Sequence, residues 1–207
     1  MRLFIAVPLP KEITDRAAAC LTGALPALKP VRPELMHITL AFLGGVADDR
    51  LAAATEAAEA VAAGHTPFDL TFDHAGRFPA AGRPRAVWLG ITAGRDELTR
   101  LAADTRRELL DRSFALEDRP FAPHLTLARV RVDAGSPESR TVSAVVDGLT
   151  VPELRVRVDR IAVVESQLSP TGPGYTTRAE APLSRASGGS PTVRGGLAMT
   201  SLPTPRQ

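Results

Sequence analysis

The sequence of 207 residues predicts an α+β fold built from two lobes of like design that face each other. Two observations lead to this prediction. The order strand, helix, strand, helix can be read in both halves of the chain. The motif His-x-Thr-Leu also occurs twice, at residues 37–40 and 124–127, in comparable places 87 residues apart. One short motif is weak evidence, but its repetition in a chain with four histidines requires an explanation.

Short apolar runs and alternating segments predict the strands. Residues 2–7 are continuously apolar and end at Pro8, which cannot donate a hydrogen bond to a neighbouring strand. Residues 68–78 alternate at their start, and residues 154–166 alternate throughout. In order along the chain, the predicted strands are 2–7, 37–45, 68–78, 85–91, 124–130, 154–166 and 175–183.

Helical spacing and capping residues predict the helices. Apolar residues recur at helical spacing from Lys11 onward and stop before Pro26. Asp48 and Asp49 are acids where a helix N-cap and first turn favour them, and Gly64 follows the Ala-rich segment as a C-cap. In order, the predicted helices are 11–25, 48–63, about 96–110 and 137–148, the last with the weakest pattern.

The repeated motif places two polar side chains on one face of each strand. Side chains two positions apart project from the same face, so His37 lies beside Thr39, and His124 beside Thr126. The apolar neighbours in the two motifs then point into the core; they are Ile38, Leu40, Leu125 and Leu127. If the two strands lie side by side or are related by a pseudo-twofold axis, one cleft receives two imidazoles and two hydroxyls.

Such a cleft suits in-line displacement at phosphorus without a metal. Two histidines of near-neutral pKa can act as general base and general acid in one reaction. Two hydroxyls can donate hydrogen bonds to phosphate oxygens or to another oxyanion. A metal site would need further ligands, and the motif has threonine where a histidine or carboxylate should stand. We therefore expect no metal and no cofactor, and we assign His65 and His74 surface or structural roles because neither has a patterned neighbour.

The charge balance limits the classes of partner. Of the 25 basic residues three lie beyond residue 183, so residues 1–183 carry 22 basic against 23 acidic residues, a balance of −1. A near-neutral body cannot supply the many phosphate contacts of non-specific duplex binding, so any nucleic-acid contact should be local. No apolar stretch is long enough to span a bilayer, and the N-terminus does not read as a secretory signal. A single cysteine, Cys20, agrees with a reducing compartment, so we expect a cytoplasmic protein with no membrane partner.

The composition changes after residue 183. Residues 184–207 contain no acid and no aromatic residue, and 14 of the 24 are Gly, Pro, Ser or Thr. Such a segment cannot bury enough apolar surface to offset its ordering entropy. We expect one bilobal domain over residues 1–183 and a disordered tail over 184–207.

Both motifs, with their flanking residues, resemble the two-histidine (2H) phosphoesterases, and within them the bacterial RNA 2′,3′-cyclic phosphodiesterase branch of LigT type. The resemblance covers about residues 1–183. It rests on these segments: RLFIAVPLP at the N-terminus, HITLAFLG, RPRAVWLGI, FAPHLTLARV, and ESQL followed by GPGY. It implies a bilobal LigT-like fold with two pseudo-twofold-related lobes, antiparallel sheets lining a central cleft, and helices outside. It also implies hydrolysis of a 2′,3′-cyclic phosphate at an RNA end to a 2′-phosphate. We expect a monomer without an obligate protein partner.

The resemblance also implies roles for single residues. His37 would protonate the departing ribose O3′ and His124 would activate water. Thr39, Thr126 and Arg129 would hold the phosphate. Phe42 would stack on the terminal base.

Strict alternation conflicts with two of these roles, because it places Phe42 and Arg129 on the face opposite the histidines. Their roles therefore require a β-bulge or a strand that ends before them. Gly44 and Gly45 make this feasible for Phe42. For Arg129 the alternative is an arginine that reaches solvent at a strand end.

Three other functions stay open at this point. The same site could run in reverse and join RNA ends through a 2′-5′ bond, although the excess of water favours hydrolysis. It could act on a small cyclic phosphodiester such as a cyclic nucleotide. From another class, it could be a non-catalytic nucleotide- or RNA-binding module, which the presence of both histidines and both threonines argues against.

Overall fold

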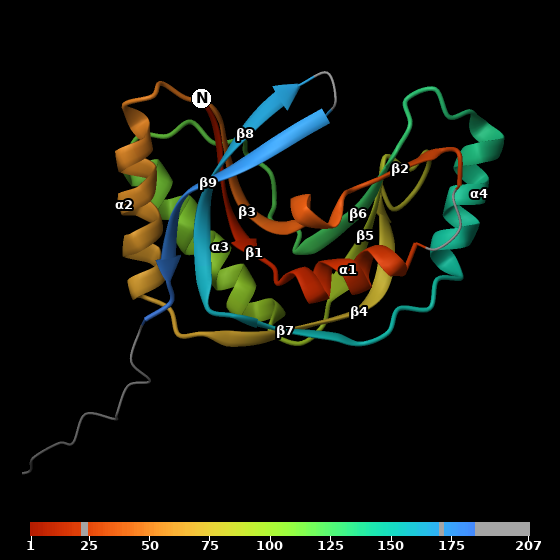
Figure 1. The fold of residues 1–207 in the computed structure, drawn as a ribbon, viewed down its shortest axis with the longest axis horizontal. Helices are drawn as coiled ribbons and strands as arrows, with labels where there is room; N and C mark the ends of the chain where they lie inside the picture. Colours follow the sequence, from red (N-terminus) through yellow and green to blue (C-terminus); the bar gives the residue numbers. More distant parts are fainter. Residues whose placement is uncertain (22–24, 170–171, 185–207) are drawn as a thin grey trace, which may run out of the picture.

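Two antiparallel sheets form the two lobes of the protein, as the computed structural model of residues 1–21, 25–169 and 172–184 shows (Figure 1). The strands are β1 (Arg2–Pro8), β2 (Leu28–Pro30), β3 (His37–Gly45), β4 (Phe68–Phe78), β5 (Ala86–Ile91), β6 (His124–Val130), β7 (Leu154–Val158), β8 (Arg160–Ser169) and β9 (Gly172–Pro182). One sheet has the order β3-β1-β8-β9, and the other has the order β2-β6-β5-β4-β7. The predicted α+β fold with two facing lobes is confirmed.

Helices pack on both sheets. In the described part of the chain they are α1 (Lys11–Ala19), α2 (Arg50–Ala63), α3 (Arg95–Asp111) and α4 (Ser136–Asp147), with a short 3-10 helix, η1 (Pro33–Leu35), before β3. Helices α2 and α3 pack on each other and on the four-stranded sheet, whereas α1 and α4 contact the five-stranded sheet. Figure 1 shows α2 at one end of the molecule and α4 at the other. None of these helices is long and apolar enough to cross a membrane.

The two lobes do not coincide with the two halves of the sequence. Strands β1 and β3 come from the start of the chain, and β8 and β9 from its end complete their sheet. Helix α3 lies between β5 and β6 in the sequence but packs on β3 of the other sheet. Each lobe therefore needs segments from both halves of the chain.

A buried apolar cluster joins the two sheets beneath the motif strands. It includes Ile38 and Leu40 of β3 together with Leu125 and Leu127 of β6, and each of these side chains is at most 6% exposed. The prediction that these four side chains point into the core is confirmed. Shared burial holds β3 and β6 against each other.

The predicted helix over residues 11–25 is wrong at its C-terminal end. Helix α1 ends at Ala19. The N–H groups of Cys20 and Leu21 then donate to carbonyls three residues earlier, which tightens the last turn as is usual at a helix end. Beyond this turn, residues 22–24 lie outside the described part of the chain.

The strand predicted over residues 154–166 is two strands. Strand β7 pairs with β4 in one sheet, and after Asp159 strand β8 pairs with β1 in the other. Alternation along the sequence does not show which sheet a strand joins. Strand β2 was not predicted, because three residues are too few to show a period.

The predicted tail lies almost entirely outside the described residues. Ser184 is the exception, and its N–H donates to the carbonyl oxygen of Ala62 in α2. The prediction of one domain over residues 1–183 stays a prediction.

Candidate active site

Two histidines at the starts of the motif strands form the centre of the site. His37 begins β3 and His124 begins β6, and these two strands are in contact across the sheets. The imidazoles are close enough for the charge of His124 to lower the pKa of His37. The structure therefore brings together the two histidines that the sequence singled out.

Each imidazole is held by the backbone two residues before it. Nδ1 of His37 is 2.8 Å from the carbonyl oxygen of Leu35, and Nδ1 of His124 is 2.6 Å from that of Ala122. A carbonyl oxygen can only accept, so Nδ1 donates in both cases. The hydrogen of the neutral ring is thus fixed on Nδ1, and Nε2 is left to take up a proton or, once protonated, to give it away.

Aromatic rings enclose His37 in the lobe formed by the four-stranded sheet, which we call the first lobe. Its ring centre lies 4.7 Å from that of Phe4 in a stacked arrangement and 5.4 Å from that of Tyr175, which meets it edge-on. These contacts fix the plane of the imidazole and remove water from two of its sides.

Aromatic rings also enclose His124 in the second lobe, which is formed by the five-stranded sheet. Its ring centre lies 4.9 Å from that of Phe78 and 6.4 Å from that of Trp88. The Trp88 ring lies over Gly76, where a Cβ atom would stand 2.3 Å from the indole carbons. The absence of a side chain at this position therefore allows Trp88 to lie close to the sheet beside His124.

The surroundings of both histidines lower their pKa values. For His37 burial is the largest cause, the hydrogen bond to Leu35 acts against it, and the charges of His124 and Arg129 lower the pKa further. For His124 burial is again first, the bond to Ala122 opposes it, and Arg129 lowers the pKa. Because a proton on one ring disfavours a proton on the other, the pair can hold a single shared charge as pH falls. One neutral and one protonated imidazole are what paired base and acid catalysis requires.

A β-bulge in β3 brings Phe42 onto the face of the histidine. On β1, Phe4 and Ala6 are two apart and project to one face. Thr39 pairs with Ala6 and Phe42 pairs with Phe4, although they are three residues apart in β3, because the register shifts between the two pairs. The ring centres of Phe4 and Phe42 are 6.0 Å apart. Phe42 thus shares the face of Thr39, and strict alternation is wrong at this point.

The same irregularity in β6 brings Arg129 onto the face of His124. Trp88 and Ala86 are two apart on β5, and they pair with Thr126 and Arg129, which are three apart on β6. Leu127, which follows the motif threonine, has no partner residue in β5, just as Leu40 has none in β1. Arg129 is exposed at this position, and its charge acts on both histidines.

The two motif strands therefore share one local design. Each runs His-x-Thr-Leu-Ala, bulges after the threonine, and presents its sixth residue on the histidine face. That residue is Phe42 in one lobe and Arg129 in the other. Among the described residues neither motif threonine has a hydrogen-bond partner for its hydroxyl, so both hydroxyls are available to a ligand.

Sequence reasoning missed His74, which lies near this site. Its Nε2 stands where a Cβ on Gly90 would come within 2.0 Å, and Gly90 pairs with His124. Nδ1 of His74 is 2.7 Å from Oδ1 of Asp73, and that carboxylate also accepts from the hydroxyl of Thr92 at 2.9 Å. His74, Gly76 and Phe78 alternate along β4, and this pattern could have placed His74 on the same face as Phe78, which contacts His124.

The remaining histidine, His65, lies away from the site. Its Nε2 is 2.9 Å from a carboxylate oxygen of Asp104 in α3.

A small pocket of about 130 Å³ lies beside Phe78 and Trp88, the two rings that flank His124. Its lining residues are His74, Phe78, Trp88, Gly90, Ile91, Arg95, Ala122 and Pro123. Within the described residues no group of three or more His, Cys, Asp or Glu side chains is placed to hold a metal ion. Metal-independent action stays a prediction, to be tested with a chelator.

The fold and the paired motifs define a two-histidine phosphoesterase, and comparison with known proteins agrees. The family model described as the 2′-5′ RNA ligase superfamily matches residues 7–169. The chain therefore belongs to the 2′-5′ RNA ligase superfamily, and the family inferred from the sequence is confirmed.

Relatives and solved structures support this assignment. The chain is 36% identical to an RNA 2′,3′-cyclic phosphodiesterase of Archaeoglobus fulgidus, over 84% of this chain and 96% of the relative. It is also 36% identical to one of Thermus thermophilus, over 85% and 87%. The crystal structure of TT0787 of Thermus thermophilus aligns with a TM-score of 0.71 at 30% identity, over 88% of this chain and 98% of that chain. Escherichia coli LigT complexed with 3′-AMP aligns with a TM-score of 0.67 at 28% identity, over 89% and 98%.

Proposed function

We propose that this protein hydrolyses the 2′,3′-cyclic phosphate at an RNA end to a 2′-phosphate without a metal ion. The observation that carries the proposal is the pair of equivalent strands, which bring two imidazoles into one site with both Nε2 atoms available. The relatives named as RNA 2′,3′-cyclic phosphodiesterases support the same substrate.

The proposed reaction requires that one histidine accept a proton from water and that the other donate a proton to the leaving oxygen. His124 takes a proton from water, whose oxygen forms a bond to phosphorus, and the bond between phosphorus and O3′ breaks. His37 gives its proton to the departing O3′, which leaves a 3′-hydroxyl and a 2′-phosphate. The pKa of His37 is lowered in the free protein, but a bound phosphate anion opposes this shift because a nearby opposite charge favours the protonated ring.

The remaining residues bind the substrate. Thr39 and Thr126 donate hydrogen bonds to the non-bridging oxygens, and Arg129 stabilises the charge that develops on them. Phe42 is 62% exposed, which leaves its ring accessible to stack on the terminal base. We further propose that the protein works in the cytoplasm as a monomer without an obligate protein partner.

A short RNA with a 2′,3′-cyclic phosphate end, incubated with purified protein and a chelator, tests the proposal. The parent should convert the end to a 2′-phosphate, and His37→Ala and His124→Ala should each lose about 10²–10⁴-fold in rate. His65→Ala is the matched control, because His65 pairs with Asp104 outside the site, and it should keep the activity of the parent. Activity lost on adding the chelator would contradict the metal-free mechanism.

Other outcomes would identify the alternatives. Turnover of a small cyclic nucleotide but not of RNA would point to a cyclic phosphodiesterase of different specificity. Joining of RNA ends under hydrolytic conditions would show the reverse reaction. RNA binding that is unchanged in both histidine variants, with no turnover, would indicate a binding module.

A further inference from the structure

Two cations lie directly opposite each other in neighbouring strands at the candidate site. Strands β2 and β6 pair so that Lys29 is the cross-strand partner of Arg129. Directly opposite residues project to the same face, with Cβ atoms about 4.5–5.5 Å apart. Since Arg129 is on the face of His124, Lys29 projects to that face as well.

The flanking pair confirms this orientation. Leu28 pairs with Val130 one position along the strands, and both pack on the apolar cluster beneath α4, which contains Val142 and Val146. That cluster lies on the other face of the sheet. Lys29, which follows Leu28, therefore points away from α4 and to the face that carries His124.

Neither cation is neutralised by the protein. Within residues 1–21, 25–169 and 172–184, the side chains of Lys29 and Arg129 make no hydrogen bond or ion pair, and both are exposed. Nearby Arg131, in contrast, pairs with Asp133 at 3.3 Å. Like charges directly opposite each other in a sheet are destabilising, so this pair costs folding energy that a bound anion would offset.

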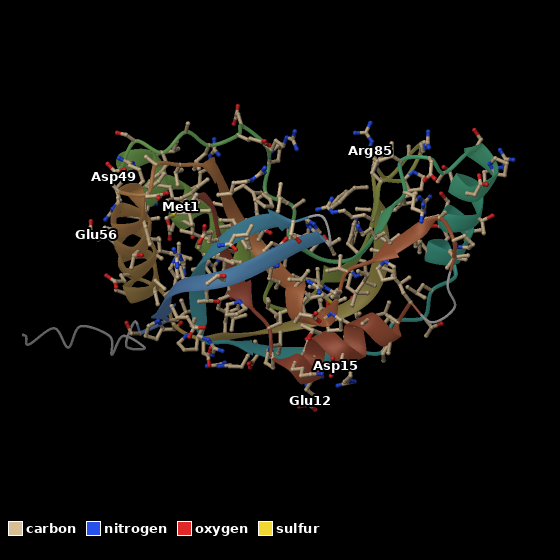
Figure 2. All side chains as sticks on the ribbon, turned by 45° about the horizontal axis from the view of Figure 1, so that its top comes forward. Met1, Glu12, Asp15, Asp49, Glu56 and Arg85 are labelled. Atoms are coloured by element: carbon tan, nitrogen blue, oxygen red, sulfur yellow. The ribbon has the colours of Figure 1, made fainter. Side chains whose placement is uncertain are left out.

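Two acids of helix α1 lie on another side of the molecule. Figure 2 shows Glu12 and Asp15 on α1 pointing away from the protein on the side opposite Arg85, which projects from the upper rim of the second lobe. Arg85 is joined to the end of β6, because its carbonyl oxygen accepts the N–H of Val130 at 2.9 Å. Since Ala86 pairs with Arg129, Arg85 stands opposite Val130 and projects to the other face, so its charge lies apart from that of Lys29 and Arg129.

We propose that Lys29 binds the second phosphate of an RNA substrate, the one on the 5′ side of the nucleotide that carries the cyclic phosphate. This inference rests on the proposed function. Arg129 is occupied by the terminal phosphate, and Lys29 stands one strand away, about 4.8 Å across the sheet, with a flexible stem that extends its reach. A lysine contacts phosphate as a point charge and carries no sequence information, which fits a contact to the backbone.

The proposal defines a substrate class. A cyclic mononucleotide has a single phosphate and leaves Lys29 unused, whereas an RNA of two or more nucleotides engages it. The protein should therefore prefer oligonucleotides with a cyclic phosphate end to the corresponding mononucleotide.

The test compares kcat/KM on a nucleoside 2′,3′-cyclic phosphate with that on a dinucleotide and a longer RNA having the same end. Lys29→Met keeps the length of the side chain and removes its charge. It should lower kcat/KM on the RNAs roughly tenfold, as expected for one charged hydrogen bond, and leave the mononucleotide unchanged. The slope of log(kcat/KM) against log[salt] should also become shallower by about 0.7, the value for one phosphate of a single strand.

Lys11→Met is the matched control, because Lys11 is the other lysine of the sequence and pairs with Asp15 on α1 at 2.6 Å. It should behave as the parent on every substrate. An equal loss on mononucleotide and RNA in Lys29→Met, or no loss on either, would overturn the proposal. If the parent turns over none of these substrates, the proposed function fails, and fluorescence anisotropy with the same RNA then decides whether Lys29 still binds its backbone.

Discussion

Phe42 and Arg129 occupy equivalent positions in the two motif strands, each brought to the histidine face by a bulge after the motif threonine. One lobe thus presents an aromatic ring and the other a cation beside the same pair of imidazoles. The equivalence explains how a near-repeat of five residues produces a site that is symmetric in its acid–base groups but not in its binding groups. It also suggests which substitutions should separate binding from proton transfer.

Removal of the Phe42 ring should weaken recognition of the base without affecting stability. Stacking on a base contributes about 1–3 kcal/mol, so Phe42→Ala should lower kcat/KM on a cyclic phosphate-ended RNA by about 5- to 150-fold. The side chain is 62% exposed, so the urea midpoint should stay near that of the parent. Val132→Ala is a suitable control, because Val132 is 96% exposed. Equal losses on a substrate that lacks the terminal base would refute the stacking role.

Removal of the Arg129 charge should raise the pKa of both histidines. Arg129 lowers the pKa of His37 and of His124, so Arg129→Met should move both imidazole titrations, followed by NMR, to higher pH. The pH profile of kcat/KM should move in the same direction while its height falls. Arg140→Met, on the exposed side of α4, should leave both titrations unchanged. A shift to lower pH would be inconsistent with the electrostatic role.

Stability should decrease as pH falls through 6.5, the ordinary pKa of histidine. The folded-state pKa values of His37 and His124 lie below it, so the unfolded chain binds protons first and unfolding becomes more favourable. The free energy of unfolding from urea titrations should therefore be lower at pH 5.5 than at pH 7.5. The double variant His37→Asn/His124→Asn should have a flatter profile. Measurement above pH 5 keeps this effect apart from the lowered pKa values of Asp104 and Asp133, which act at more acidic pH.

A side chain at position 90 should displace His74. A Cβ there would stand 2.0 Å from Nε2 and 2.3 Å from Cε1 of His74, so Gly90→Ala should cost about 1–3 kcal/mol by overpacking. In the double variant Gly90→Ala/His74→Ala the obstacle is gone, and the urea midpoint should return toward that of His74→Ala alone. Gly45→Ala, where nothing lies within 4 Å, controls for the loss of glycine. A double variant no more stable than Gly90→Ala would show that the imidazole is not the conflicting group.

The bounds of a strand or helix could be predicted where the residues of that segment alone show a clear periodicity and clear end signals. The bounds predicted for β4 and β6 agree with the structure, because alternation and the following turn residues are local features. The helix predicted past Ala19 and the strand predicted across Asp159 were wrong. In the strand, the alternation continues across Asp159 although the pairing partner changes from β4 to β1.

The histidines and threonines of the site follow from the sequence alone, because side chains two apart in a strand share a face whatever the strand pairs with. The positions of Phe42, Arg129, His74 and Lys29 were decided by the tertiary structure. A bulge exists only relative to a neighbouring strand, and the pairing of Lys29 with Arg129 joins residues 100 positions apart. Periodicity describes one segment, whereas register is set by burial and hydrogen bonding against another segment. The sequence by itself therefore determined the acid–base groups, and only the folded chain decided which residues surround them.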